Sequence, residues 1–286
     1  MKSLILRRSG GSAALVLAFA VSACATTGSQ SAMGDDGALY ADFLRGRYAS
    51  LTSDASASAT FYREALRRAP GDQEILERAV TRTLIAGDIR GAAALETAAK
   101  KAGASTSLGG LAIDADNIVR RKYSTAQKDL PNIDDMGPFN RLIDMTLRAW
   151  AKVGQGDVDG AIVMLKASSS GSTLDRLNDY QMALVYDYAG RNADARAAYD
   201  RAWKSGLRLA VDVDAYGRLL ERSGDQAGAI ALYEEFISNV GENPTIQASL
   251  ARARAKLPAP KIASPAEGAA IAIFGPAAAL TAQTGG

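Results

Sequence analysis

Small and apolar residues between positions 149 and 233 recur at intervals of 34 residues, far longer than the period of one helix or strand. Four such columns stay in register over three consecutive segments. The columns are Ala149, Ala183 and Gly217; Gly156, Gly190 and Gly224; Ala161, Ala195 and Ala229; and Leu165, Tyr199 and Tyr233. A fixed period of this length is typical of repeat architectures, in which each repeat is one supersecondary unit. The pattern predicts stacked pairs of antiparallel helices joined by short turns.

The residue types in the columns agree with helix pairs. A glycine such as Gly224 follows the first helix, where a left-handed residue ends a helix at least cost. Asn192 and Asp225 then stand where a polar residue opens the second helix. A small residue such as Gly217 lets the two helices of a pair approach closely. The tyrosine column, which includes Tyr233, is expected to fill the gap between repeats.

The columns resemble those of the tetratricopeptide repeat family, most clearly over residues 175–244. More degenerate units cover residues 39–72, 73–105, 103–140 and 141–172, and the third ends in a break rich in Pro, Gly and Asp at residues 131–138. The resemblance implies an all-α, right-handed superhelical solenoid of about six repeats over residues 39–257. Solenoids of this kind bind their partners along the concave wall formed by the first helices.

Residues 258–286 form a separate segment rich in Pro and Ala. It follows a last helix expected at residues 245–257, closed by Pro258 and Pro260. The stretch from Ser264 to Glu267 has the pattern of a capping box with Pro at the first helical position. It opens an apolar run, residues 269–282, which Gly275 and Pro276 are expected to interrupt. Because the run has little polar face, we expect that it packs back on the solenoid or that it begins a further repeat.

The first 23 residues have the organisation of a secretory signal peptide, a basic start followed by about ten apolar residues. The four residues that end in Cys24 are aliphatic, small, small and Cys, which resembles the lipobox of bacterial lipoproteins. That resemblance implies acylation of Cys24, a tether over residues 24–38, and the periplasmic face of a Gram-negative outer membrane, because Ala25 rather than Asp follows. An ordinary signal peptide with an incidental cysteine is the alternative interpretation.

Composition narrows the possible chemistry. The 286 residues contain no histidine and one cysteine, which excludes Ser-His-Asp and Cys-His nucleophiles, His-ligated zinc and internal disulfides. The net charge of +2 becomes −1 without residues 1–23, so it does not indicate a nucleic-acid partner. The Asp-x-Asp pairs that begin at Asp114, Asp157 and Asp212 are expected at turns or helix starts rather than at a metal. We expect no metal and no cofactor.

Counting along the first helices selects candidate residues for the concave, partner-binding groove. These candidates are Trp150, Tyr180, Leu184, Tyr188, Arg218 and Arg222. Aromatic and arginine side chains are the usual hot spots of protein interfaces. Packing between repeats is the alternative role for each of them. The family's carboxylate-clamp groove needs Asn in the row that Trp150, Leu184 and Arg218 occupy, so a clamp of that kind is not expected.

Together these patterns predict a non-catalytic scaffold for protein–protein interactions, anchored by lipid and serving an envelope assembly or secretion complex. Its partners would be other envelope proteins or peptides. The alternative is a regulator, or a hydrolase that uses carboxylates alone, acting on cell-wall glycan. Such a hydrolase needs two acids about 5–10 Å apart in a cleft. Glu234 and Glu235 are adjacent on one helix, so their side chains diverge.

Overall fold

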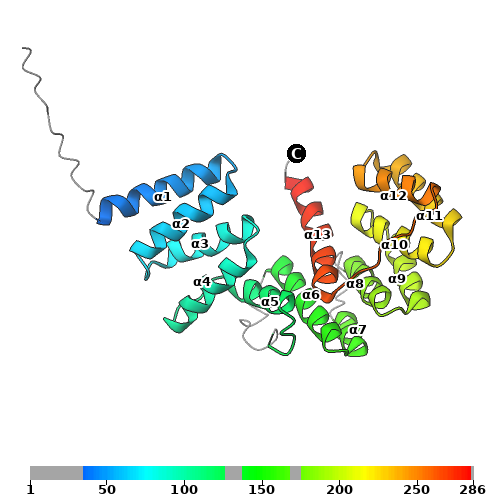
Figure 1. Cartoon of the computed structure of the whole chain (residues 1–286), viewed down its shortest axis with the longest axis horizontal. Coiled ribbons are helices and arrows are strands. Elements are labelled where there is room, and N and C mark those ends of the chain that lie inside the picture. Colours follow the sequence, from blue (N-terminus) through cyan, green and yellow to red (C-terminus); the bar gives the residue numbers. More distant parts are fainter. Residues whose placement is uncertain (1–34, 126–136, 168–174, 285–286) are drawn as a thin grey trace, which may run out of the picture.

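The computed structural model describes residues 35–125, 137–167 and 175–284, and every regular element in these ranges is an α-helix (Figure 1). The thirteen helices of these ranges are α1 (Asp35–Leu51), α2 (Ala55–Arg68), α3 (Gln73–Ile85), α4 (Ile89–Lys101), α5 (Gly109–Val119), α6 (Pro138–Gly154), α7 (Val158–Ala167), α8 (Asp175–Tyr188), α9 (Asn192–Lys204), α10 (Ala210–Arg222), α11 (Gln226–Val240), α12 (Pro244–Arg254) and α13 (Pro265–Thr284). The predicted signal peptide and Cys24 lie outside the described residues.

Consecutive helices pack in pairs, and each pair packs on the next along one curved stack (Figure 1). This arrangement confirms the predicted all-α solenoid. Five of the six expected repeats are complete helix pairs in the part of the chain that the structure describes. The third repeat contributes α5 there, and its remaining predicted positions around residues 126–136 lie outside the described ranges. Helix α1 begins at Asp35, so residues 35–38 belong to this helix and not, as predicted, to the tether. The acidic side chains of Asp35 and Asp36 are favourable in the first turn of a helix.

The turns inside the repeats follow the sequence pattern with one exception. Gly190 and Gly224 have positive φ angles of 73° and 82°, as predicted for residues that end a helix. The Asp225 side chain accepts a hydrogen bond from the Gly228 amide and caps α11. Asn192 is the first residue of α9, one position after the cap, which Arg191 occupies without a side-chain cap hydrogen bond. The Arg191 guanidinium lies 4.8 Å from the centre of the Tyr186 ring and pairs with Asp159 and Asp194.

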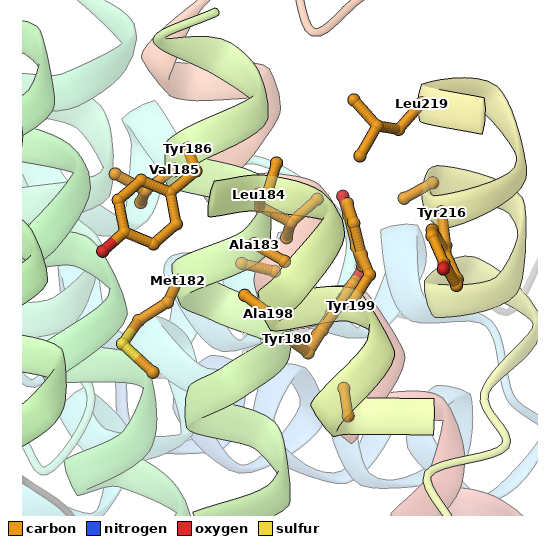
Figure 2. Packing of buried hydrophobic residues seen from close by; sticks show 14 of the residues in the cluster. Tyr180, Met182, Ala183, Leu184, Val185, Tyr186, Ala198, Tyr199, Tyr216 and Leu219 are labelled. Atoms are coloured by element: carbon orange, nitrogen blue, oxygen red, sulfur yellow. The ribbon is translucent and has the colours of Figure 1, made fainter. Parts of the chain in front are cut away.

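The core combines alanine and aliphatic side chains with several buried aromatic rings. Tyr199 of α9 stacks on Tyr216 of α10, with ring centres 5.2 Å apart and planes 14° from parallel (Figure 2). This contact joins two repeats, as predicted for the tyrosine column. In the next repeat, Gly217 of α10 lies directly against the ring of Tyr233 on α11. A side chain on Gly217 would overlap that buried ring, so the column needs a small residue there.

Helix α13 packs back on the solenoid, which decides between the two expectations for the C-terminal segment. Its N-terminus has the predicted cap: the Glu267 amide donates to Ser264 Oγ over 3.2 Å, and the Ala263 amide donates to Glu267 Oε2 over 2.7 Å. The predicted interruption at Gly275 and Pro276 is wrong, since α13 is continuous to Thr284. Gly275 is buried in the contact with the solenoid, and this packing supports the helix through the break. None of the helices described is long and apolar enough to cross a membrane.

Candidate functional site

The candidate site is the concave side of the solenoid, and helix α13 occupies it. Helix α13 contacts α5, α6, α8 and α10, although in the chain it follows α12 (Figure 1). Three of these four helices, α6, α8 and α10, are the first helices of successive repeats. In Figure 1, α13 stands between the arm formed by α1 to α4 and the arm formed by α10 to α12. We call the surface of α6, α8 and α10 that faces α13 the groove.

The first contact in the groove joins Trp150 of α6 with Gly268 of α13. The Trp150 side chain is fully buried, and any side chain on Gly268 would overlap its ring. Tyr188 of α8 meets the Trp150 ring edge to face, with ring centres 5.8 Å apart and an interplanar angle of 70°. The indole of Trp150 therefore lies between the end of α8 and Gly268 of α13. At position 268 only glycine fits against the ring.

A second contact lies one to two turns further along α13. The Tyr180 hydroxyl lies 3.5 Å from the Ile271 carbonyl oxygen, at the limit of a hydrogen bond. A methyl group on Gly275 would approach Cγ2 of Val211, on α10, to 2.6 Å. Ala272, between these two positions, is fully buried. Gly268, Ala272 and Gly275 therefore form a stripe of small residues along the face of α13 that packs into the groove.

Two ion pairs border the groove. Arg222 of α10 binds both carboxylate oxygens of Asp187 on α8, over 2.6 and 2.7 Å. The same guanidinium donates to the carbonyl oxygen of Pro260 over 2.6 Å, in the segment that leads to α13. Arg218 pairs with Asp214 on its own helix over 2.5 Å. Arg222 therefore links the repeats of α8 and α10 to the segment that precedes α13.

Beside α13 the groove is not completely filled. A cavity of about 400 Å³ remains between α10, α13 and the segment that joins α12 to α13. Its walls combine the two ion pairs with Ile271 and Phe274 of α13. The Phe274 side chain is 60% exposed beside the cavity. The unfilled part of the groove is thus charged on one side and apolar on the other.

The structure places the predicted groove residues as follows. Trp150 and Tyr180 contact α13, Tyr188 packs on Trp150, and Arg218 and Arg222 line the cavity. Leu184 lies in the core (Figure 2). Trp150, Tyr180 and Leu184 are fully buried, so they do not form an exposed binding surface in this conformation. For Leu184 the cause is packing inside the solenoid, and for Trp150 α13 provides part of the cover.

The repeat pattern in the sequence does not indicate that Gly268 and Gly275 lie in the groove. Both belong to the apolar run whose lack of a polar face raised the expectation that it packs back. Their spacing of seven residues, with Ala272 between them, places all three on one face of a helix. This stripe of small residues is the feature of the sequence that could have identified the face of α13 that packs into the groove.

The carboxylates of the cavity do not form an acid–base pair for hydrolysis. Asp187 binds Arg222, and Asp214 binds Arg218 and accepts a hydrogen bond from Ser249 Oγ over 2.5 Å. A general acid must hold a proton near neutral pH, which an arginine partner opposes. Within the described ranges no group of three or more acids or cysteines could hold a metal ion.

The Asp-x-Asp pairs have structural positions. Asp157 caps α7 by accepting from the Gly160 amide over 2.9 Å, as predicted for a turn. The prediction is wrong for Asp114 and Asp116, which lie inside α5 rather than at its start. Asp116 pairs there with Arg120, one turn later on the same helix, over 2.7 Å. This ion pair explains an acid in the middle of the helix.

Asp212, in the first turn of α10, is the most unusual acid of the groove region. Its side chain is buried, and burial raises its pKa from 3.8 to about 8, against a smaller opposing effect of Arg208. Asp212 also contributes to a raised pKa of Tyr180, whose main cause is burial of the phenol. The carboxyl group is therefore neutral in the folded protein at neutral pH.

We expect Asp212 to make folding less favourable as the pH rises from about 4 to 8. In this range the folded protein keeps the proton on Asp212 and the unfolded chain loses it, so the unfolded chain binds fewer protons. The folding equilibrium constant of the wild type should then fall by up to roughly ten-fold per pH unit relative to that of Asp212→Asn. Urea unfolding at pH 5, 6 and 7 measures this difference. Asp36→Asn, on an exposed aspartate, should follow the wild type; parallel curves for Asp212→Asn and wild type would contradict the expectation.

Comparison with known proteins supports the fold. No model of a known protein family matches the sequence, and no curated protein matches it. Among solved structures, a tetratricopeptide repeat protein from Parabacteroides merdae aligns with a TM-score of 0.51 and 12% identity, over 76% of this chain and 86% of that one. A tetratricopeptide repeat protein from Thermus thermophilus aligns with a TM-score of 0.41 and 16% identity, over 76% and 99% of the two chains. The helix pairs and the likeness to the Parabacteroides merdae protein together give the chain the fold of a tetratricopeptide-type helical solenoid.

Proposed function

We propose that this chain is a non-catalytic scaffold that binds helical segments of other envelope proteins in the groove of α6, α8 and α10. A lipid on Cys24 holds it at the periplasmic face of the outer membrane, where it serves an envelope assembly or secretion complex. The observation that carries the binding role is the seating of a helix, α13, in the groove. A surface that accepts one helix by shape has the form needed for another.

The chemistry of the groove favours a helical ligand. Trp150 and Val211 meet glycine backbone rather than side chains, so the ligand must approach closely along its length. A helix with a small-residue face can do this, because its backbone hydrogen bonds are already satisfied internally. Arg222, at the border of the groove, donates to the carbonyl oxygen of Pro260, in the segment that precedes α13. Apolar contact and a few directed polar contacts together are typical of helix-in-groove recognition.

Crosslinking in cells tests the proposed function. A photo-crosslinking amino acid at Thr245 should capture an envelope protein that mass spectrometry can identify, because Thr245 is exposed on α12 and lines the cavity. The control position is Val163 on α7, which is also exposed but lies away from the cavity. Capture from Thr245 and not from Val163 would support a partner in the groove. Equal capture from both positions, or none from Thr245, would contradict the proposed function.

A further inference from the structure

Helix α13 lies in the groove as a ligand would, and not as part of a repeat. The other helices pack chiefly on their neighbours in the chain, whereas α13 packs on helices that end at least 43 residues before it begins. The helix before it, α12, packs on α10 and α11. Residues 255–264, which include Pro258 and Pro260, cross from α12 to the groove without regular structure beyond a turn. The position of α13 is therefore set by the groove.

The outward face of α13 is not that of a permanent cap. The last helix of a solenoid normally presents polar residues to water, since no further repeat covers it. Among its 20 residues, α13 has a single charged one, Glu267, at its N-terminus. Ala270 and Phe274 are exposed and line the open cavity beside the small-residue stripe. These exposed apolar positions suit a helix that has a second environment.

The face that enters the groove is defined by size. Gly268 fits against the Trp150 ring, Ala272 is fully buried, and Gly275 fits against Val211. The groove thus selects a helix with small residues at the first, fifth and eighth positions of a two-turn stretch. Close approach of backbones across such a stripe is a known mode of helix association.

Resting on the function proposed above, we propose that α13 is an internal ligand of the groove, and that a partner binds by displacing it. The partner segment is an apolar helix with a Gly or Ala stripe equivalent to Gly268, Ala272 and Gly275. In the absence of a partner, the chain blocks its own site. A tethered ligand acts at an effective concentration of order millimolar, so it lowers the apparent affinity of every competitor.

A labelled peptide with the sequence of residues 262–284, extended by three lysines for solubility, tests the proposal. The wild-type chain should bind it weakly. Gly268→Leu should remove α13 from the groove, because the new side chain would overlap the Trp150 ring. We expect this variant to bind the peptide at least ten-fold more tightly. Ala197→Leu adds the same side chain on an exposed position of α9, away from the cavity, and should bind as the wild type does. Fluorescence anisotropy measures all three affinities.

Equal affinities for the three proteins would overturn the proposal, and so would peptide binding by none of them. A wild-type dimer held by exchange of α13 between two copies, detected by light scattering, would also overturn it. Circular dichroism establishes that Gly268→Leu keeps its helices. Should that variant not fold, Gly275→Leu, which clashes with Val211, replaces it in the same assay.

The two proposals can fail separately. The peptide assay needs no natural partner, so it probes the groove alone. A gain of peptide binding by Gly268→Leu without crosslinks from Thr245 in cells would support the internal ligand and contradict the scaffold function. Crosslinks from Thr245 with no gain of peptide binding would support the scaffold and overturn the internal ligand.

Discussion

Cys24→Ala is expected to move the protein from the membrane fraction to the soluble periplasm. The four residues that end in Cys24 fit a lipobox, and Cys24 is the single cysteine of the chain. A protein carrying two or more acyl chains stays on a membrane, whereas one without them has no comparable attachment through this segment. Separation of membrane and soluble fractions, followed by immunodetection, measures the change.

Ala25→Asp is the matched variant for this experiment. It keeps the cysteine, so the protein should remain in the membrane fraction. By the sorting behaviour that the lipobox resemblance implies, it should shift from the outer to the inner membrane. Cys24→Ala that still fractionates with membranes would contradict lipid anchoring, and an unchanged distribution of Ala25→Asp would contradict the outer-membrane assignment alone.

Gly217→Leu is expected to destabilise the fold by about 3 kcal/mol or more, the upper range for overpacking in a core. The new side chain would enter the space of the Tyr233 ring. That ring cannot move aside at low cost, since its hydroxyl donates to Glu221 over 2.9 Å and accepts from Arg252 over 3.2 Å. Chemical unfolding followed by circular dichroism gives the difference in the free energy of unfolding.

Gly71→Leu is the control for Gly217→Leu. Gly71 lies in the turn before α3, and an added Cβ there has no neighbour within 4 Å. Its substitution should change the free energy of unfolding by no more than about 0.5 kcal/mol. Similar losses for both variants would show that close packing against Tyr233 is not what restricts position 217.

The sequence predicts the repeat fold well because the physical requirements are local and recur. A left-handed residue at Gly224, a capping acid at Asp225 and a small residue at Gly217 are each needed in the same repeat. The glycine and the small residue recur 34 residues earlier as Gly190 and Ala183, whereas Arg191 stands at the position of the capping acid. Such consistency lets a pattern of residue types specify helix ends and helix pairs without knowledge of distant contacts.

The occupied groove was less predictable, because it depends on contacts between distant parts of the chain. Gly268 and Trp150 are 118 positions apart, and nothing in the local pattern of α13 selects one apolar surface over another. The same contact explains why α13 continues through Gly275 and Pro276, where local propensity predicts a break. The count along the first helices still found Trp150, Tyr180, Arg218 and Arg222 near the groove. It could not show that a segment of the same chain covers part of it.

The Arg222 guanidinium has a mechanical consequence. It holds the carboxylate of Asp187 in the preceding repeat and the carbonyl oxygen of Pro260 in the segment before α13. Arg222 therefore links the segment that leads into the groove with the joint between α8 and α10. The curvature of a solenoid is the sum of such joints. We expect that emptying or filling the groove changes the curvature of the arch at this joint.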